Sequence, residues 1–304
     1  MRLAHAHSGT ETSAGEPAGG LDLILDWTFD PTFLVPLVIA LLYFRGLWRY
    51  WALGGVSFPA WRPAMFLLGL ATLAAALLSP IDALADRSFA WHMVQHLLLT
   101  LVAAPLILLG APFVPVIRGL PAVFRRAVFI PFARNRAVRW ILVTVTRPIV
   151  AFIAYTASLW AWHDATLYDL TLANELVHYL EHFNFFVVAV LLWWHVVSPH
   201  PFRSRMGYLA RIGFLIGSSV QSNALGALIA FSGSAWYAYR SLPGFWGLTA
   251  AEDQMIGGLL MWVGGAILHL IAITIIFVVY AIQEQAKEPP RMLYIQRDDL
   301  PGTV

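Results

Sequence analysis

Residues 88–109 read SFAWHMVQHLLLTLVAAPLILL. This run contains no Asp, Glu, Lys or Arg, and it is long enough to cross a bilayer as an α-helix, which takes about 20 apolar residues. Similar apolar stretches recur along the chain. Together with the quoted run they are residues 32–51, 63–81, 88–109, 147–165, 175–197, 207–231 and 255–282. They are too long for barrel strands and lack their alternation. Because only helices and closed barrels satisfy the backbone in lipid, the sequence predicts an all-α integral membrane protein, a seven-transmembrane helical bundle.

Composition supports the same fold class and excludes several functions. Of the 304 residues, 59% are hydrophobic and 12% are charged, whereas soluble domains are about 45–50% apolar and about 25% charged. Cysteine is absent, which excludes disulfides, thiolate metal sites, iron–sulfur clusters and covalent haem attachment. No predicted helix contains Lys, so a retinal Schiff base is excluded. The sequence also lacks a nucleotide-binding loop, an HExxH motif and a Ser-His-Asp arrangement. We therefore expect a binding protein, not an enzyme, with no nucleic-acid partner.

Basic residues indicate the orientation. They gather in the connections after the first, third, fifth and seventh stretches, which the positive-inside rule places in the cytoplasm. The N-terminus is then outside and the C-terminus inside. We expect residues 1–31 to be an extracytoplasmic polar tail, residues 32–282 the membrane domain and residues 283–304 a cytoplasmic tail. The cytoplasmic loop 110–146 mixes apolar residues with Arg and Pro, which is typical of an interfacial helix that contacts anionic lipid headgroups.

Histidines gather near the extracytoplasmic ends of three predicted helices. At about 1.5 Å of rise per residue, all lie within about 12 Å of those ends. They are His92, His96, His163, His178 and His182. Two pairs have i, i+4 spacing, so each pair shares one helix face. Neutral imidazoles bind copper, zinc, iron and nickel, and we expect a metal site there.

Polar neighbours extend this candidate site. Glu175 and Glu181 lie close in sequence to His178 and His182 and are candidate partners that would orient the two imidazoles. Gln95 lies between the other two histidines. Asp253 and Met255 belong to the last predicted helix, which starts on the same side, and a methionine ligand would favour Cu(I).

Other interpretations remain open at this stage. A single histidine at a membrane interface is more often hydrogen-bonded within a bundle than a ligand, although two pairs at matched depth favour ligation. Imidazoles from two helices can also hold one haem b, as in an electron-transfer subunit. A transporter of metal ions or small solutes would use the polar run around Gln221 and Asn223, but no inverted repeat is visible. Gly213 and Gly217 predict a helix contact, and we expect His269 to form an interhelical hydrogen bond.

Four segments resemble a known family. They are WHMVQHLLLTLVAAPLILLGAP (91–112), WHDATLYDL (162–170), HYLEHFNFF (178–186) and EDQMIGGLLMW (252–262). They are similar to the CtaG family of caa(3)-type cytochrome c oxidase assembly factors, and the resemblance extends over roughly residues 33–282. It maps His92 and His96 onto an HxxQH pattern, His163 onto WH, His178 and His182 onto HxxEH, and Asp253 onto DQ.

The resemblance implies a multi-pass protein of the bacterial plasma (inner) membrane. Such a protein would take part in the maturation of a haem–copper oxidase by holding or supplying copper. Its partners would be oxidase subunits or other copper chaperones, besides the lipid bilayer.

Overall fold

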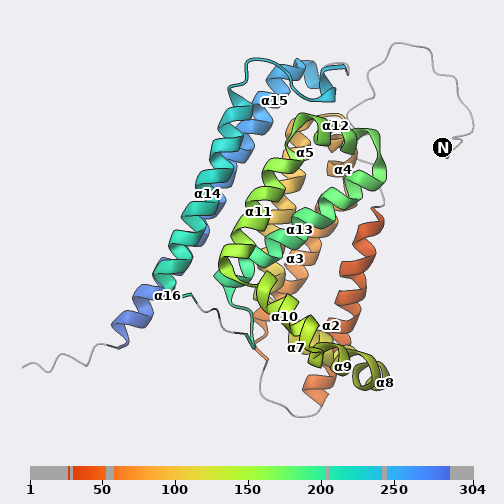
Figure 1. Cartoon of the computed structure of the whole chain (residues 1–304), viewed down its shortest axis with the longest axis vertical. Coiled ribbons are helices and arrows are strands. Elements are labelled where there is room, and N and C mark those ends of the chain that lie inside the picture. Colours follow the sequence, from red (N-terminus) through yellow and green to blue (C-terminus); the bar gives the residue numbers. More distant parts are fainter. Residues whose placement is uncertain are drawn as a thin grey trace, which may run out of the picture.

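The computed structural model describes Trp27 and residues 30–52, 58–202, 204, 206–241 and 245–287. Within these ranges every regular element is a helix and no strand occurs. The long helices run roughly along the longest axis of the molecule (Figure 1). The all-α prediction is therefore confirmed for the described part of the chain. The polar tail that carries His5 and His7, and most of the predicted tail 283–304, lie outside the described residues.

Five helical segments are long and apolar enough to cross a bilayer. Two of them are single helices, α13 (Glu175–Val197) and α14 (Tyr208–Ala230). The segment Pro31–Ala52 consists of the short helix η1 (Pro31–Phe33) and α2 (Leu34–Ala52), and the segment Phe89–Leu109 consists of α5 (Phe89–Leu97), the π-helical turn η2 (Leu98–Ala103) and α6 (Ala104–Leu109). The segment Ala250–Gln285 consists of α15 (Ala250–Leu259), the π-helical turn η6 (Leu260–Gly264) and α16 (Gly265–Gln285). These helices indicate a membrane protein.

The other two predicted stretches are helical but shorter. Helix α3 (Trp61–Leu77) has 17 residues, and α11 (Pro148–Trp162) has 15. Helix α11 follows α10 (Arg136–Val145) after a bend of 68°. The structure therefore supports the helical nature of all seven stretches, whereas the number of seven spans and the orientation stay predictions.

The basic loop 110–146 folds into a series of short helices where the sequence predicted one interfacial helix. They are α7 (Phe113–Gly119), α8 (Ala122–Phe124), the π-helical turn η3 (Arg125–Phe129), α9 (Ile130–Arg134) and α10. Helices α8, η3 and α9 follow one another without a gap; Pro121 precedes this segment, and Asn135 ends it and caps α10. Helix α7 packs along α2, which anchors the loop to the bundle.

Short elements close the opposite end of the bundle. Helices α4 (Pro80–Ala85) and α12 (Ala165–Ala173) and the short helix η4 (Ala238–Ser241) lie in the connections there, and η5 (Phe245–Gly247) precedes α15. Figure 1 shows α4, α12 and the start of α5 together at this end, which we call the α12 end. A buried aromatic core lies beneath it, formed by Phe89, Tyr168, Phe185, Tyr237 and Tyr239. This core excludes water from the region that holds the histidines.

Asp253 joins the first turns of two helices at the α12 end. Its carboxylate accepts hydrogen bonds from the Ser88 hydroxyl at 2.6 Å and from the backbone amide of Phe89 at 2.6 Å. Ser88 is itself the N-cap of α5 and accepts from the Trp91 amide. A carboxylate at a helix N-terminus satisfies amides that have no partner within the helix and stabilises the positive end of the helix dipole. Asp253 thereby fixes the start of α5 against α15.

Glycines allow the closest helix contacts, but not the pair predicted from the sequence. A Cβ atom added to Gly46 would overlap the Pro115 carbonyl oxygen, and one added to Gly226 would lie 2.7 Å from the Trp262 amide nitrogen. Nothing lies within 4 Å of the corresponding position on Gly213, and Gly217 meets only the Phe152 ring, at 3.3 Å. The sequence could not distinguish these glycines because all lie in apolar helices.

Gly46 and Gly213 provide a matched test of the packing. Gly46→Ala should lower the thermal unfolding midpoint in detergent, because α2 and α7 must move apart, and overpacking of this kind costs about 1–3 kcal/mol. Gly213→Ala should leave the midpoint unchanged or raise it, since alanine favours a helix over glycine by about 1 kcal/mol. Equal effects of the two substitutions would contradict the assigned α2–α7 contact.

Candidate metal centre

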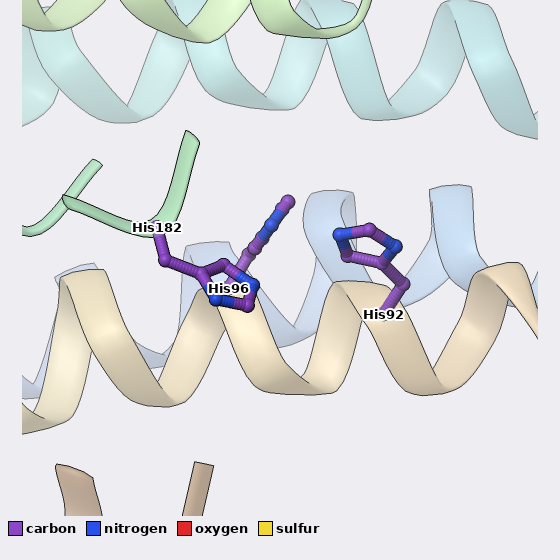
Figure 2. Close-up of side chains that lie close together, drawn as sticks. All are labelled: His92, His96 and His182. Carbon is purple, nitrogen blue, oxygen red and sulfur yellow. The ribbon is translucent and has the colours of Figure 1, made fainter. Parts of the chain in front are cut away.

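Two helices bring four imidazoles and one carboxylate together beneath the α12 end. His92 and His96 project from α5, and His178, Glu181 and His182 project from α13; we call these five residues the histidine–glutamate cluster. The ring centroids of His92 and His178 are 5.1 Å apart, and those of His96 and His182 are 5.8 Å apart. Figure 2 shows that the rings of His92, His96 and His182 lie close together although they come from two helices. The i, i+4 faces therefore turn toward each other.

Two subsets of the cluster have the spacing of metal ligands. His92, His96 and His182 each offer one ligand atom within 4.8 Å of the others, and so do His92, His178 and Glu181. Ligands about 2.1 Å from a tetrahedral ion are about 3.4 Å from one another. Side-chain movements on the order of an ångström would therefore bring either subset to coordination distance. His92 belongs to both subsets and lies at the centre of the cluster.

The hydrogen bond that His92 makes through Nδ1 leaves the lone pair of its Nε2 atom available to a metal ion. Its Nδ1 lies 3.1 Å from the Tyr239 hydroxyl, which donates its proton to the Ala85 carbonyl oxygen at 2.5 Å. Because that proton is committed, Tyr239 must accept from Nδ1–H of His92. A neutral imidazole protonated at Nδ1 carries its lone pair on Nε2. Tyr239 thus sets the tautomer in the way that the orienting partners of metal-binding histidines do.

Asp30 performs the same role for His182. The Asp30 Oδ2 atom lies 3.2 Å from His182 Nδ1, and both side chains are buried. Burial opposes ionisation of Asp30, but hydrogen bonds from His182 and Thr32 hold the pKa of this carboxyl below its usual range. An ionised carboxylate only accepts hydrogen bonds, so His182 donates from Nδ1 and keeps the Nε2 lone pair.

Glu181 is fully buried and faces the histidines of α5. Its Oε2 lies 3.6 Å from His92 Nε2 and its Oε1 lies 3.7 Å from His96 Nε2. These separations exceed hydrogen-bond length, and neither oxygen has a hydrogen-bond partner among the described residues. We had expected Glu181 to orient His182, but it points toward the other pair. A buried carboxyl group either keeps its proton or pairs with a positive charge, and a cation bound among these imidazoles would provide that pairing.

The remaining predicted residues have other roles. Gln95 donates to the Ala76 carbonyl at 2.9 Å and to Asp82 at 2.7 Å, so it fixes α5 to α3 and α4. Asp253 accepts from Ser88 and the start of α5, as described above. Glu175 is exposed, and no hydrogen bond joins it to His178 in the described part of the chain. Met255 is 43% exposed. These placements do not favour Gln95, Glu175, Asp253 or Met255 as ligands.

His163 lies next to the cluster but outside its two compact subsets. Its ring centroid is 6.2 Å from that of His96, and its Nδ1 donates to the Leu159 carbonyl at 2.7 Å. His269 also differs from expectation, because its Nδ1 donates within its own helix, to the Gly265 carbonyl at 2.8 Å. His195, near the end of α13, and the exposed His200 lie at the opposite end of α13 from the cluster.

Comparison with known proteins shows the family of this chain. Residues 41–281, which contain the whole cluster, match the family described as cytochrome c oxidase caa3 assembly factor (Caa3_CtaG). The chain belongs to the Caa3_CtaG family. The resemblance noted for the four sequence segments is thereby confirmed, and the family supports a role in oxidase assembly.

Curated relatives of this Caa3_CtaG protein occur in mycobacteria. The chain is 26% identical over 310 residues to "Uncharacterized protein Mb0105" of Mycobacterium bovis, covering 97% of this chain and 45% of that protein. It is 25% identical over 266 residues to "Uncharacterized protein ML1998" of Mycobacterium leprae, covering 85% of this chain and 40% of that protein. The chain therefore spans less than half the length of these relatives. No solved structure matches it.

Asp30 and Tyr239 are the two site residues that the sequence analysis missed. Asp30 was assigned to the polar tail, although the run Asp30-Pro31-Thr32 is a typical helix start with an N-cap followed by proline. That signal would have placed a carboxylate at the end of the first helix. Tyr239 carries no comparable signal, since it lies in the short helix η4 between α14 and α15, far from His92 in sequence.

Asp30→Asn tests the orienting role. An asparagine in this position can present its amide NH2 to His182, which disfavours the tautomer with the free Nε2 atom. We expect the affinity for Cu(II) or Zn(II), measured by chelator competition on the purified full chain, to fall by about 10–100-fold. Glu175→Gln removes an exposed carboxylate at the start of the same helix α13 and should leave the affinity unchanged. An unchanged affinity in Asp30→Asn would contradict the assigned role.

Proposed function

We propose that this Caa3_CtaG protein holds copper in the histidine–glutamate cluster during maturation of a haem–copper cytochrome c oxidase. The observation that carries the proposal is the Glu181 carboxylate, buried without a hydrogen bond from the described residues and surrounded by imidazoles with oriented Nε2 lone pairs. A carboxylate oxygen and imidazole nitrogens are the donors that a bound cation needs. Nothing in this arrangement requires catalysis, and we infer a binding role.

The donor set suits copper. Among divalent first-row metals, Cu2+ binds nitrogen and oxygen sites most strongly, and imidazole is a good ligand for it. The chain contains no cysteine, so any ligand exchange with a partner would use imidazole, carboxylate or thioether groups. The family supports the assembly role, and the cluster supplies the chemistry that connects this role to a metal.

We further propose the topology in which this function would operate. Seven spanning helices with the N-terminus outside would place the α12 end, and with it the cluster, on the extracytoplasmic side of the bacterial plasma membrane. The supporting observation is the basic loop 110–146, which lies at the opposite end of α5 and α6 from His92 and His96. The partners would be subunits of a haem–copper oxidase or other copper chaperones.

The geometry does not favour the haem alternative. The rings of His92 and His178, which come from facing helices, have centroids 5.1 Å apart and leave no room for a porphyrin between them. The cavity beside the cluster measures about 30 Å3, which accommodates one water-sized body but no porphyrin. The bundle would have to open before a haem could enter.

The polar run of α14 does not favour the transport alternative. Gln221 is bonded to the Trp160 ring nitrogen at 3.1 Å and to Ser222 at 2.9 Å. Ser222 donates to the Ser218 carbonyl at 2.9 Å, and Asn223 pairs with Ser219 at 3.2 Å. These side chains are therefore engaged in hydrogen bonds within α14 and to Trp160 of α11.

Metal content tests the proposal directly. The purified full chain should carry copper, and His92→Ala combined with His182→Ala should reduce the copper bound in the cluster at least tenfold, because both triads lose a ligand. In cells that lack the wild-type protein, the same double variant should fail to restore assembly of active caa3-type oxidase. His200→Ala, which alters an exposed histidine far from the cluster, should behave as wild type. Copper content and oxidase assembly unaffected by the double substitution would reject the proposal.

A further inference from the structure

A small cavity continues inward from the cluster toward the middle of the bundle. Its volume is about 30 Å3, and it lies between α5, η2, α11, α14, η6 and α16. Its wall includes three imidazoles and two thioethers, those of His96, His163, His269, Met93 and Met261. All five side chains are buried. His96 belongs both to this wall and to the histidine–glutamate cluster, so the two regions are adjacent.

The tautomers of two of these histidines are set by backbone carbonyls. His163 donates from Nδ1 to the Leu159 carbonyl, and His269 donates from Nδ1 to the Gly265 carbonyl. A carbonyl oxygen can only accept, so each neutral ring carries its lone pair on Nε2. Neither Nε2 atom has a hydrogen-bond partner among the described residues, and neither nitrogen of His96 has one. Buried polar atoms nearly always have a hydrogen-bond partner or a ligand, so these nitrogens indicate a ligand-binding position.

Three hydroxyl groups line the cavity wall, and each donates its proton elsewhere. The Thr100 hydroxyl donates to the His96 carbonyl at 2.6 Å, and the Ser222 hydroxyl donates to the Ser218 carbonyl at 2.9 Å. The Tyr155 hydroxyl is hydrogen-bonded to Ser222, and because the Ser222 proton is on the Ser218 carbonyl, Tyr155 is the donor in that bond. The cavity wall thus presents lone pairs on nitrogen and sulfur.

The helices change geometry beside this cavity. The π-helical turn η2 (Leu98–Ala103) follows directly after His96 and Leu97, and the π-helical turn η6 (Leu260–Gly264) contains Met261. A π turn widens the helix and is frequently found at functional sites. Both turns adjoin the cavity, and they alter the direction in which Met261 and the residues after His96 project from their helices.

The chemistry of this wall differs from that of the cluster. No carboxylate lines the cavity, so an ion bound there would keep its charge in a buried apolar setting. A monovalent ion is much less costly to bury than a divalent one. Thioether and imidazole ligands together select Cu(I), whereas carboxylate ligands suit harder ions.

We propose that the cavity is a second copper position, specific for Cu(I), with His96 and His163 as imidazole donors and Met93 and Met261 as thioether donors. His269 forms the inner end of the cavity. The inference rests on the proposed function only in taking copper as the metal, and apart from His96, which borders both positions, it assigns residues outside the cluster. Met93 and Met261 pack in one buried cluster with Leu159 and Phe185, which holds both thioethers within the same apolar region.

Copper binding and X-ray absorption distinguish the two positions. The full chain in detergent would be equilibrated anaerobically with Cu(I) in the presence of a competing chelator. We expect two copper ions per chain and a copper–sulfur contribution in the absorption spectrum. Met93→Leu with Met261→Leu should reduce the stoichiometry to one copper and remove the sulfur contribution, because leucine keeps the volume and lacks the donor. Met255→Leu alters an exposed methionine and should change neither quantity.

The outcomes separate this inference from the proposed function. A wild-type chain that binds one copper with nitrogen and oxygen ligands alone, lost in the His92→Ala and His182→Ala double variant, would overturn the second position and leave the proposed function standing. Copper with sulfur ligands that persists in that double variant would support the second position. If the double methionine variant does not fold, Met261→Leu alone and His163→Gln provide the same readout, with folding checked by thermal unfolding. Retention of the full sulfur contribution in both would also overturn the inference.

Discussion

The central constraint in this protein is the buried carboxyl group of Glu181, whose oxygens face the histidines of α5. Glu181 is enclosed by imidazoles, and aromatic side chains cover the cluster toward the α12 end. In such a low-dielectric setting a carboxyl group either keeps its proton or has a positive partner within a few ångströms. The surrounding architecture serves this region: Asp253 fixes the start of α5, Gln95 attaches α5 to α3 and α4, and Tyr239 and Asp30 orient two of the rings.

Periodicity explains why the helices and the four histidines of the cluster could be predicted from the sequence. The i, i+4 spacing of His92 and His96, and of His178 and His182, determined which side chains share a face, and apolar stretches located the helices. Helix rotation is different, because it depends on contacts with neighbouring helices. Glu181, one residue before His182, was therefore expected to assist its neighbour in sequence, but it faces the histidines of α5.

Residues that act across long sequence separations were the ones that the sequence could not reveal. Tyr239 reaches His92 from the short helix η4, and Asp30 reaches His182 from the first helix. Met255 and Met261 are six positions apart, and only packing distinguishes the exposed one from the one beside the histidines. The π-helical turns η2 and η6 shift the helix register. A regular α-helix would therefore give the wrong directions for the side chains after His96 and around Met261.

Burial within the cluster is uneven, and this has a consequence for molecular recognition. His178 is partly accessible, whereas His92, Glu181 and His182 are enclosed. Under the proposed function, a protein that exchanges a ligand with this cluster would reach it over the first turn of α13. The interior would then select the ion through its nitrogen and oxygen donors, and the rim around His178 would select the partner. Because these two kinds of selectivity would reside in different residues, variation at the rim would redirect the protein to another client without altering its preference among metals.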